Sequence, residues 1–367
     1  MKTETSPVRL NKLQEEMTKV GVDLTAIAPT SNMRYLLGFS PMPDERLCVL
    51  LVTRNATRLV IPDLNADQVE AHTGFRGIRW KDEAGPDQAL AEALDDLDAT
   101  RPAVLAVDAS MRADALLVLQ KVTQPGRSAS AADLMAALRM RKSESELEVL
   151  ARAAALADEA LMVGAEACRP GVTEREVAEC IAAHFREGGA AMVDFALVAS
   201  GPHSGFPHHT AGERQIQAGD TVILDVGATL DGYKSDITRV VHLGDPPSEL
   251  RAIYDTVREA NQRACEAARP GARACDVDHA ARSVIEEAGY GPYFVHRTGH
   301  GLGMDVHEEP WITAESTTVL EPGMVFSVEP GVYLADRFGV RIEDIVVVTD
   351  GPSRRLTGLD HDLIVKT

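Results

Sequence analysis

The sequence is short of basic residues, and it lacks paired cysteines and long apolar runs. Its 37 lysines and arginines stand against 56 aspartates and glutamates, for a formal net charge of −19. Nucleic acid and anionic membrane surfaces demand a basic face, so we expect neither as a partner. The N-terminal segment has no apolar core typical of a signal peptide, and no later run is long enough to span a bilayer, which favours the cytoplasm.

The cysteines are odd in number and form no C-x-x-C pair. This argues against a disulfide framework and against a thiolate zinc site. Most of them lie in Ala-rich stretches typical of helices, so we interpret them as reduced and structural: Cys48, Cys168, Cys180, Cys265 and Cys275.

The first part of the chain alternates helical and strand patterns. An amphipathic helix is predicted at residues 9–21, followed by a strand and by a hairpin that turns near Asn55. Further strand and helix patterns follow up to the polar segment QPGRSASAAD. We therefore predict a mixed α/β domain over residues 1–132.

The second part, residues 133–367, carries an internal duplication. Its first long helix begins with Ser143 and Glu146 at capping-box spacing and ends at CRPG; the same ending recurs as ARPG at residues 268–271. Downstream, AGDTVILDVG is loosely repeated as PGMVFSVEPG. Two halves related by an approximate two-fold axis would bring their hairpins together at the centre of this domain.

Each half presents two carboxylates from apolar strands. If the first hairpin turns at its D-G dipeptide, Thr238 faces Asp225, and Asp236 is the diagonal neighbour of Asp225 on the same face. Around the turn ADRFG of the second hairpin, Glu329 is expected to lie diagonal to Glu343 by the same reasoning. Edge-strand acids facing water are the alternative, but it fits poorly with such apolar neighbours.

Four carboxylates in an apolar interior would repel one another strongly. The strands offer few cations to neutralise them, Arg239 and Arg341 being the obvious candidates. Divalent metal is the better counterion, and carboxylates shared between two ions would form a binuclear site.

A nitrogen ligand is available in the glycine-rich segment VHRTGHGLGMDVHEEP, which holds His296, His300 and His307. A helical H-x-x-x-H zinc pair is disfavoured, because Thr-Gly and Gly-Leu-Gly interrupt any helix there. Ordinary polar loop histidines are the other alternative, and the four patterned carboxylates weigh against it.

Together, DVGATLDGYKSDITR, HRTGHGLGMDVHEEP, SVEPGVY and VRIEDIVVV resemble the creatinase/aminopeptidase/prolidase family, within it the Xaa-Pro dipeptidase and aminopeptidase P branch. The resemblance covers the chain from about Leu134 to its end, and SNMRYLLGF resembles the smaller domain of that branch. It implies an α+β protein with a creatinase-like α/β domain (1–132) and a pita-bread metallopeptidase domain (133–367).

The resemblance implies five metal ligands. Asp236 and Glu343 would bridge two divalent ions, with Asp225 on one ion and His300 and Glu329 on the other. Manganese is the expected metal, with cobalt or zinc as alternatives, and an oxygen-rich shell with one imidazole suits manganese.

The same resemblance assigns substrate residues. It places His208 near the proline-binding side, His307 at the scissile amide and His296 in the pocket behind them. Arg341 corresponds to an arginine that precedes the last ligand, and Tyr233 to a tyrosine beside the cluster. A plain turn-flanking aromatic is the alternative for Tyr233.

These residues predict a peptidase for proline-containing peptides. Glu329 would accept a proton from water and pass it to the leaving nitrogen, while His307 supports the tetrahedral intermediate. We favour an Xaa-Pro dipeptidase (prolidase), with an aminopeptidase P acting on longer peptides as the alternative. A non-catalytic binding module and a metal-independent amidine hydrolase are disfavoured by the full ligand set. The resemblance also implies a homodimer.

Overall fold

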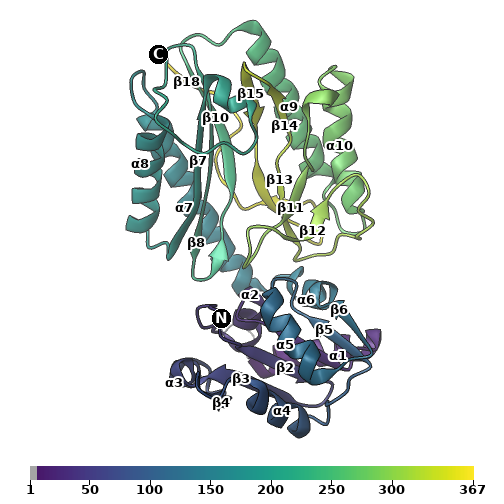
Figure 1. Ribbon diagram of the computed structural model, residues 1–367. Coiled ribbons are helices and arrows are strands. Elements are labelled where there is room, and N and C mark those ends of the chain that lie inside the picture. The colour runs from purple at the N-terminus through teal and green to yellow at the C-terminus, as the bar shows by residue number, and fades with distance from the viewer. Residues whose placement is uncertain (1–5) are drawn as a thin grey trace. The chain divides into compact units, whose positions relative to one another are not determined.

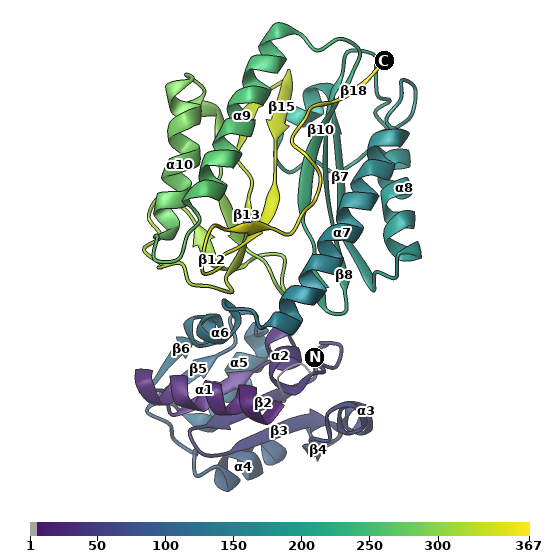
Figure 2. The same ribbon diagram turned by 180° about the vertical axis from the view of Figure 1, so that it is seen from behind.

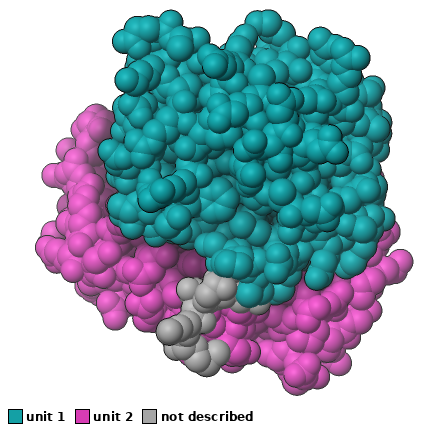
Figure 3. All heavy atoms as spheres, turned by 90° about the horizontal axis from the view of Figure 1, so that it is seen from below, with its two compact units in different colours: residues 1–139 teal, residues 140–367 magenta. Residues whose placement is uncertain are grey.

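The structure is a computed structural model that describes residues 6–367 (Figure 1; Figure 2 shows it from behind). The chain forms two compact units, residues 1–139 and 140–367, which Figure 3 distinguishes by colour. Helices and strands occur in both units, which confirms the predicted α+β class. Within the described range, no helix is both long and apolar enough to cross a membrane.

Unit 1 is built on a six-stranded sheet with the order β4-β3-β2-β1-β5-β6. The hairpin predicted around Asn55 is β2–β3. Helix α6 belongs to this unit, since the Tyr35 hydroxyl donates to the Leu138 carbonyl at 3.0 Å. The structural division therefore falls one helix later than the boundary predicted after residue 132. The elements are α1 (Ser6–Val20), β1 (Leu24–Ile27), α2 (Ser31–Leu37), β2 (Val49–Thr53), β3 (Thr57–Pro62), α3 (Asp63–Thr73), β4 (Ile78–Trp80), α4 (Asp87–Asp96), β5 (Val104–Val107), α5 (Ala113–Thr123), β6 (Arg127–Ser130) and α6 (Ala132–Arg139).

Unit 2 consists of two copies of a helix–helix–hairpin arrangement. The first copy contains α7 (Glu144–Ala167), α8 (Glu174–Glu187), β7 (Met192–Ser200), η1 (Gly201–Gly205), β8 (Thr221–Leu230), β9 (Tyr233–Lys234) and β10 (Ile237–Leu243). The second contains α9 (Ser248–Ala267), α10 (Ala274–Glu287), η2 (Gly291–Tyr293), β11 (Gly299–Gly301), β12 (Glu308–Ile312), β13 (Val325–Val328), β14 (Gly331–Leu334), β15 (Phe338–Arg341) and β16 (Asp344–Val347). The short strands β17 (Arg354–Arg355) and β18 (Ile364–Lys366) follow.

The duplication extends to individual backbone hydrogen bonds. The N–H of Gly171 donates to the carbonyl of Ile216 at 2.9 Å, and that of Gly271 donates to Leu320 at 2.8 Å. Both glycines have positive φ, 91° and 86°, a conformation that glycine adopts without a side-chain penalty. The two RPG turns are therefore equivalent in geometry, which confirms the predicted internal duplication.

Each copy contributes one sheet and a pair of helices that covers one face of it. The first sheet has the order β18-β10-β8-β7, with β9 on β8; the second has the order β12-β11-β13-β16-β17, and β14–β15 forms a separate pair. Figures 1 and 2 show α7 and α8 beside the first sheet and α9 and α10 beside the second. Two apolar cores, one for each copy, fill the space between the helices and the strands.

The two copies meet at a seam between β10 and the start of β16. Thr238 forms an isolated antiparallel bridge with Glu343, and the N–H of Glu343 donates to the Thr238 carbonyl at 3.2 Å. The Thr238 hydroxyl also donates to Glu343 Oε2 at 2.7 Å. The two hairpins that carry the predicted metal ligands are therefore in direct contact.

Candidate active site

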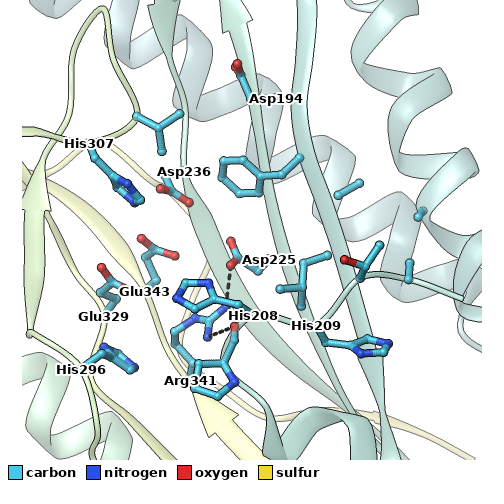
Figure 4. Close-up of a pocket in the computed structure, with 18 of the residues that line it drawn as sticks. Asp194, His208, His209, Asp225, Asp236, His296, His307, Glu329, Arg341 and Glu343 are labelled. Atoms are coloured by element: carbon cyan, nitrogen blue, oxygen red, sulfur yellow. Dashed lines mark hydrogen bonds and ion pairs between the residues drawn. The ribbon is translucent and has the colours of Figure 1, made fainter. Parts of the chain in front are cut away.

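A pocket of about 1140 Å³ in unit 2 contains most of the predicted site. Nine of the ten predicted site residues line it, drawn from both copies, and Figure 4 labels all of these except His300. They are His208, Asp225, Asp236, His296, His300, His307, Glu329, Arg341 and Glu343.

The first hairpin has the predicted register. Asp225 in β8 lies opposite Thr238 in β10, because a two-residue turn at Asp231 and Gly232 joins β8 to β9. Asp236 lies between β9 and β10, immediately before β10 begins at Ile237, and is 4% exposed. In Figure 4 the side chains of Asp225 and Asp236 point into the same pocket.

The second hairpin differs from the prediction. Val328 pairs with Asp344 and Gly331 pairs with Arg341, and this register places Glu329 directly opposite Glu343. The expected diagonal arrangement is wrong, because the loop between β14 and β15 contains residues 335–337 and not all five residues of ADRFG. The two carboxylates still face the same pocket (Figure 4).

His300 comes from β11 and completes the donor set. Its Nε2 lies 3.3 Å from Glu329 Oε1 and 3.8 Å from Asp236 Oδ2. One donor atom each from Asp236, His300 and Glu343 lie within 4.8 Å of one another. These spacings are short enough for one ion to contact several of the side chains.

Burial and mutual repulsion shift the acids of this cluster. Burial, reinforced by the neighbouring carboxylates, raises the pKa of Asp225 and raises that of Asp236 and Glu343 well above the usual range. Burial would also raise the pKa of Glu329, but the hydrogen bond and charge of His300 outweigh it and lower that pKa to about 2. The folded protein therefore brings several carboxylates together in a buried site, where the negatively charged form is unfavourable.

Asp225 tests whether a metal fits this site. One of its oxygens, Oδ2, accepts a hydrogen bond from Arg341, whereas Oδ1 is buried and has no hydrogen-bond partner in the part of the chain that the structure describes. A buried carboxylate oxygen without a donor is costly, and a cation would satisfy it. Four carboxylates and one imidazole form a donor set that divalent ions accept, so the residues fit.

Arg341 supports the cluster through four protein contacts. Its guanidinium donates to the Thr238 hydroxyl (3.1 Å), the Pro207 carbonyl (3.3 Å), the Tyr333 hydroxyl (2.8 Å) and Asp225. The side chain is 5% exposed. The predicted contact between Arg341 and substrate stays a prediction.

The pocket histidines lie on different walls. His307 packs its ring edge-on to His300 with centroids 4.2 Å apart, and burial, with the charge of His300, lowers its pKa to about 4. His296 Nε2 lies 2.8 Å from the Tyr333 hydroxyl. His208 lines the opposite side beside Arg341 (Figure 4).

Tyr233 is the predicted site residue that the structure does not bring to the pocket. Its hydroxyl donates to Glu146 at 2.7 Å, and its ring packs in a core cluster with Leu150 and Leu302. The side chain therefore faces helix α7. The tyrosine that touches the site is Tyr333, which lies inside the quoted motif SVEPGVY but whose direction depends on the register of β14 on β15.

Arg297 is a pocket residue that sequence reasoning missed. Its guanidinium lies over the Trp311 ring, 4.4 Å from the centroid, and burial lowers its pKa. The charges of Glu329 and Glu309 act on it in the opposite direction, but neither lies within ion-pair distance of Arg297, and no other carboxylate among residues 6–367 does. Its sequence position between His296 and the predicted ligand His300, in a pocket otherwise rich in acids, could have indicated it.

Comparisons with known proteins match both parts of the chain. The chain matches Metallopeptidase family M24 over residues 148–350 and the Creatinase/Prolidase N-terminal domain over residues 9–141. It is 40% identical over 352 residues to a probable dipeptidase PepE of Mycobacterium tuberculosis, covering 92% of this chain and 91% of that protein.

Two further relatives carry Xaa-Pro names. The chain is 34% identical over 357 residues to the Xaa-Pro dipeptidase of Pyrococcus horikoshii, covering 97% of this chain and 98% of that protein. The crystal structure of a recombinant prolidase from Thermococcus sibiricus superposes with a TM-score of 0.93 at 36% identity, covering 99% of this chain and all of the other.

Proposed function

Because the chain belongs to Metallopeptidase family M24, we propose that it hydrolyses the Xaa-Pro bond of proline-containing dipeptides with two divalent ions. The observation that carries this proposal is the cluster of side chains at the seam between the two copies. Four carboxylates and His300 converge there, and Asp225 Oδ1 lacks a hydrogen-bond donor among the described residues. The names of the relatives support the substrate class.

The family resemblance implies how five residues would hold the ions. Asp236 and Glu343 would contact both ions, Asp225 would contact one of them, and His300 and Glu329 would contact the other. Bound ions supply Lewis acidity that activates a water and polarises the scissile carbonyl. An oxygen-rich donor set favours manganese over zinc.

Glu329 is our choice for the proton transfer. Its Oε1 accepts a hydrogen bond from the Ser327 hydroxyl at 3.2 Å and faces His300. Its Oε2 is then the atom that takes a proton from water and delivers it to the proline nitrogen. His307, kept neutral near pH 7 by its low pKa, supports the tetrahedral intermediate, and His208 and His296 border the proline ring.

Arg297 supports a dipeptide substrate in preference to a longer one. A dipeptide carries its carboxylate on the proline itself, within a few bonds of the scissile amide. We assign this carboxylate to Arg297, the pocket cation with no carboxylate partner in the described range. In a longer peptide the same position is an uncharged amide, so a substrate that extends beyond proline would lose this ion pair.

The test compares Ala-Pro, Ala-Pro-Gly-Gly and Ala-Ala as substrates, with manganese and with a chelator. We expect manganese-dependent hydrolysis of Ala-Pro, and loss of activity in Asp236→Asn but not in the matched hairpin variant Asp231→Asn. Equal turnover of Ala-Ala and Ala-Pro would exclude proline specificity. Preference for Ala-Pro-Gly-Gly would assign the protein as an aminopeptidase P, a reading supported by the 30% identical X-Pro aminopeptidase structure from Thermotoga maritima.

We also propose a homodimer that works in the cytoplasm. All five cysteines are free thiols, which suits a reducing compartment. The dimer rests on the family resemblance. Light scattering on the purified protein tests the dimer, and cell fractionation tests the compartment.

A further inference from the structure

A segment of unit 2 places His208 in the pocket, and hydrogen bonds to a single carboxylate hold the side of this segment that faces away from the pocket. This segment, residues 200–212, leaves β7 at Ser200, passes through η1 and returns at Gly212. Glu174, the first residue of α8, has a fully buried side chain behind it. Glu174 Oε1 accepts the N–H and the hydroxyl of Ser200 at 2.8 and 2.7 Å, and Oε2 accepts the N–H of Gly212 at 3.2 Å.

Two imidazoles from inside the segment reach the same carboxylate. His203 Nδ1 lies 2.9 Å from Glu174 Oε1, and His209 Nε2 lies 2.8 Å from Oε2. The two rings are 4.3 Å apart and tilted by 35°. Glu174 therefore holds the segment at both ends and at two internal positions, and His208 is the immediate neighbour of one of them.

The front of the segment is held by the second copy. The Pro207 carbonyl accepts a hydrogen bond from Arg341 at 3.3 Å, and the Ser204 hydroxyl accepts the N–H of Gly339 at 3.0 Å. His208 thus follows a residue tied to the ligand-supporting Arg341 and precedes a residue tied to Glu174. Its placement depends on contacts from both sides.

Five donors converge on a carboxylate that no lysine or arginine pairs with in the described part of the chain. Hydrogen bonds to a charged acceptor are stronger than neutral ones, so a carboxylate suits this position better than an amide. A glutamine would accept at one oxygen only and would direct its own N–H donors at an imidazole and at the Gly212 N–H. The negative charge of Glu174, and not only the size of its side chain, is therefore required to accept all five hydrogen bonds.

We propose that Glu174 is a positioning residue that fixes His208 for the reaction assigned above, on which this inference rests. It acts through the segment and contacts no substrate. Glu174, His203 and His209 could also hold a metal ion by their spacing. The Ser200 and Gly212 donors already occupy the carboxylate, and this favours the hydrogen-bonded arrangement.

The decisive experiment is a double-mutant cycle of Glu174→Gln with His208→Ala, measured as kcat and KM for Ala-Pro at saturating manganese. The matched control is Glu176→Gln, which removes the exposed capping-box acid of the same helix. We expect Glu174→Gln to lower kcat/KM by about tenfold in the wild type and to have no further effect in His208→Ala. Glu176→Gln should leave kcat/KM unchanged.

Equal losses in both backgrounds, or no loss in the wild type, would overturn the proposal. If Glu174→Gln does not fold, His209→Gln removes one contact and keeps the carboxylate; it should show the same dependence on His208 with a smaller loss. Zinc titration adds a separate outcome: a third equivalent of ion bound by the wild type and lost in His209→Gln would make the cluster a metal site, and would contradict the hydrogen-bonded assignment.

A spectroscopic readout separates this inference from the proposed function. The ring C–H resonance of His208, assigned by its loss in His208→Ala, should shift or broaden in Glu174→Gln and stay in place in Glu176→Gln. This result is expected even if Ala-Pro is not the substrate. An unmoved resonance together with active enzyme would refute the positioning role alone.

Discussion

The buried carboxylates predict a change in stability whose sign depends on whether metal is bound. Asp236 is 4% exposed, and burial together with the adjacent Glu343 raises its pKa well above the usual range. A raised pKa means that the charged form destabilises the folded state at neutral pH. We therefore expect Asp236→Asn, which removes the charge at nearly constant size, to be more stable than the wild type when no metal is present.

The magnitude follows from the pKa shift. Each unit by which the folded pKa exceeds the unfolded value costs about 1.4 kcal/mol, up to a ceiling of about 4 kcal/mol at pH 7, because beyond that point the group keeps its proton. A domain the size of unit 2 changes its Tm by about 2–4 °C per kcal/mol. The metal-free variant should thus melt above the metal-free wild type, and the ceiling of about 4 kcal/mol limits the difference to about 8–16 °C.

Metal should reverse this order. One ion at a hundred times its Kd adds about 2.7 kcal/mol of stability, or about 5–11 °C in Tm. The variant lacks the carboxylate of Asp236, which we propose as a shared ligand, and should gain little. The assay is differential scanning calorimetry at pH 7 with EDTA or with excess manganese, and Asp231→Asn, an exposed change in the same hairpin, should behave as the wild type in both.

The pH dependence gives a second check on the sign. Because the folded pKa of Asp236 is raised, its penalty is absent below the ordinary aspartate range and grows as the pH rises towards the folded pKa. The stability gap between the metal-free proteins should therefore close on acidification. A metal-free variant less stable than the wild type at pH 7, or equal stabilisation of both by manganese, would refute the reasoning.

Three further predictions concern neighbouring positions. Arg297→Met should raise KM for Ala-Pro by about 10- to 100-fold, which corresponds to the loss of one charge-assisted hydrogen bond, and should leave KM for the Ala-Pro amide unchanged. Equal increases in KM for both substrates would show that Arg297 does not bind the substrate carboxylate. Gly299→Ala would place a Cβ 1.8 Å from the Ser327 carbonyl oxygen and should lower the free energy of unfolding by at least about 1–3 kcal/mol in urea titrations; an unchanged midpoint would contradict this. Asp344→Asn should cost about 3–5 kcal/mol by the same assay, because it leaves the buried Arg239 without its carboxylate, and a loss below 1 kcal/mol would argue that the pair is dispensable.

Local signals explain which parts of the site were predictable. The D-G dipeptide defines a two-residue turn, so the pairing of Asp225 with Thr238 follows from counting along the strands. The capping box predicted at Ser143 is local in the same sense and is present. Where one short motif determines the geometry, the sequence is sufficient.

Tertiary contacts explain what was missed. The turn between β14 and β15 has no distinctive dipeptide, and a loop of different length changed the expected relation of Glu329 to Glu343. Tyr233 faces Glu146 because helix α7 packs on that side, which no pattern in its own strand reveals. Glu174 lies in the first turn of α8, where acids are common, and its hydrogen bonds depend on a segment that returns from β7.

The seam between the two copies has a consequence for how the protein matures. Each copy supplies only part of the donor set, so neither copy could bind two metal ions by itself. A partly folded chain would therefore bind metal weakly, with an incomplete set of ligands. Metal uptake should therefore be a late event that follows assembly of both sheets instead of nucleating them. In the cell, metal occupancy would then indicate completed folding, because a chain that binds its ions has already packed its two copies together correctly.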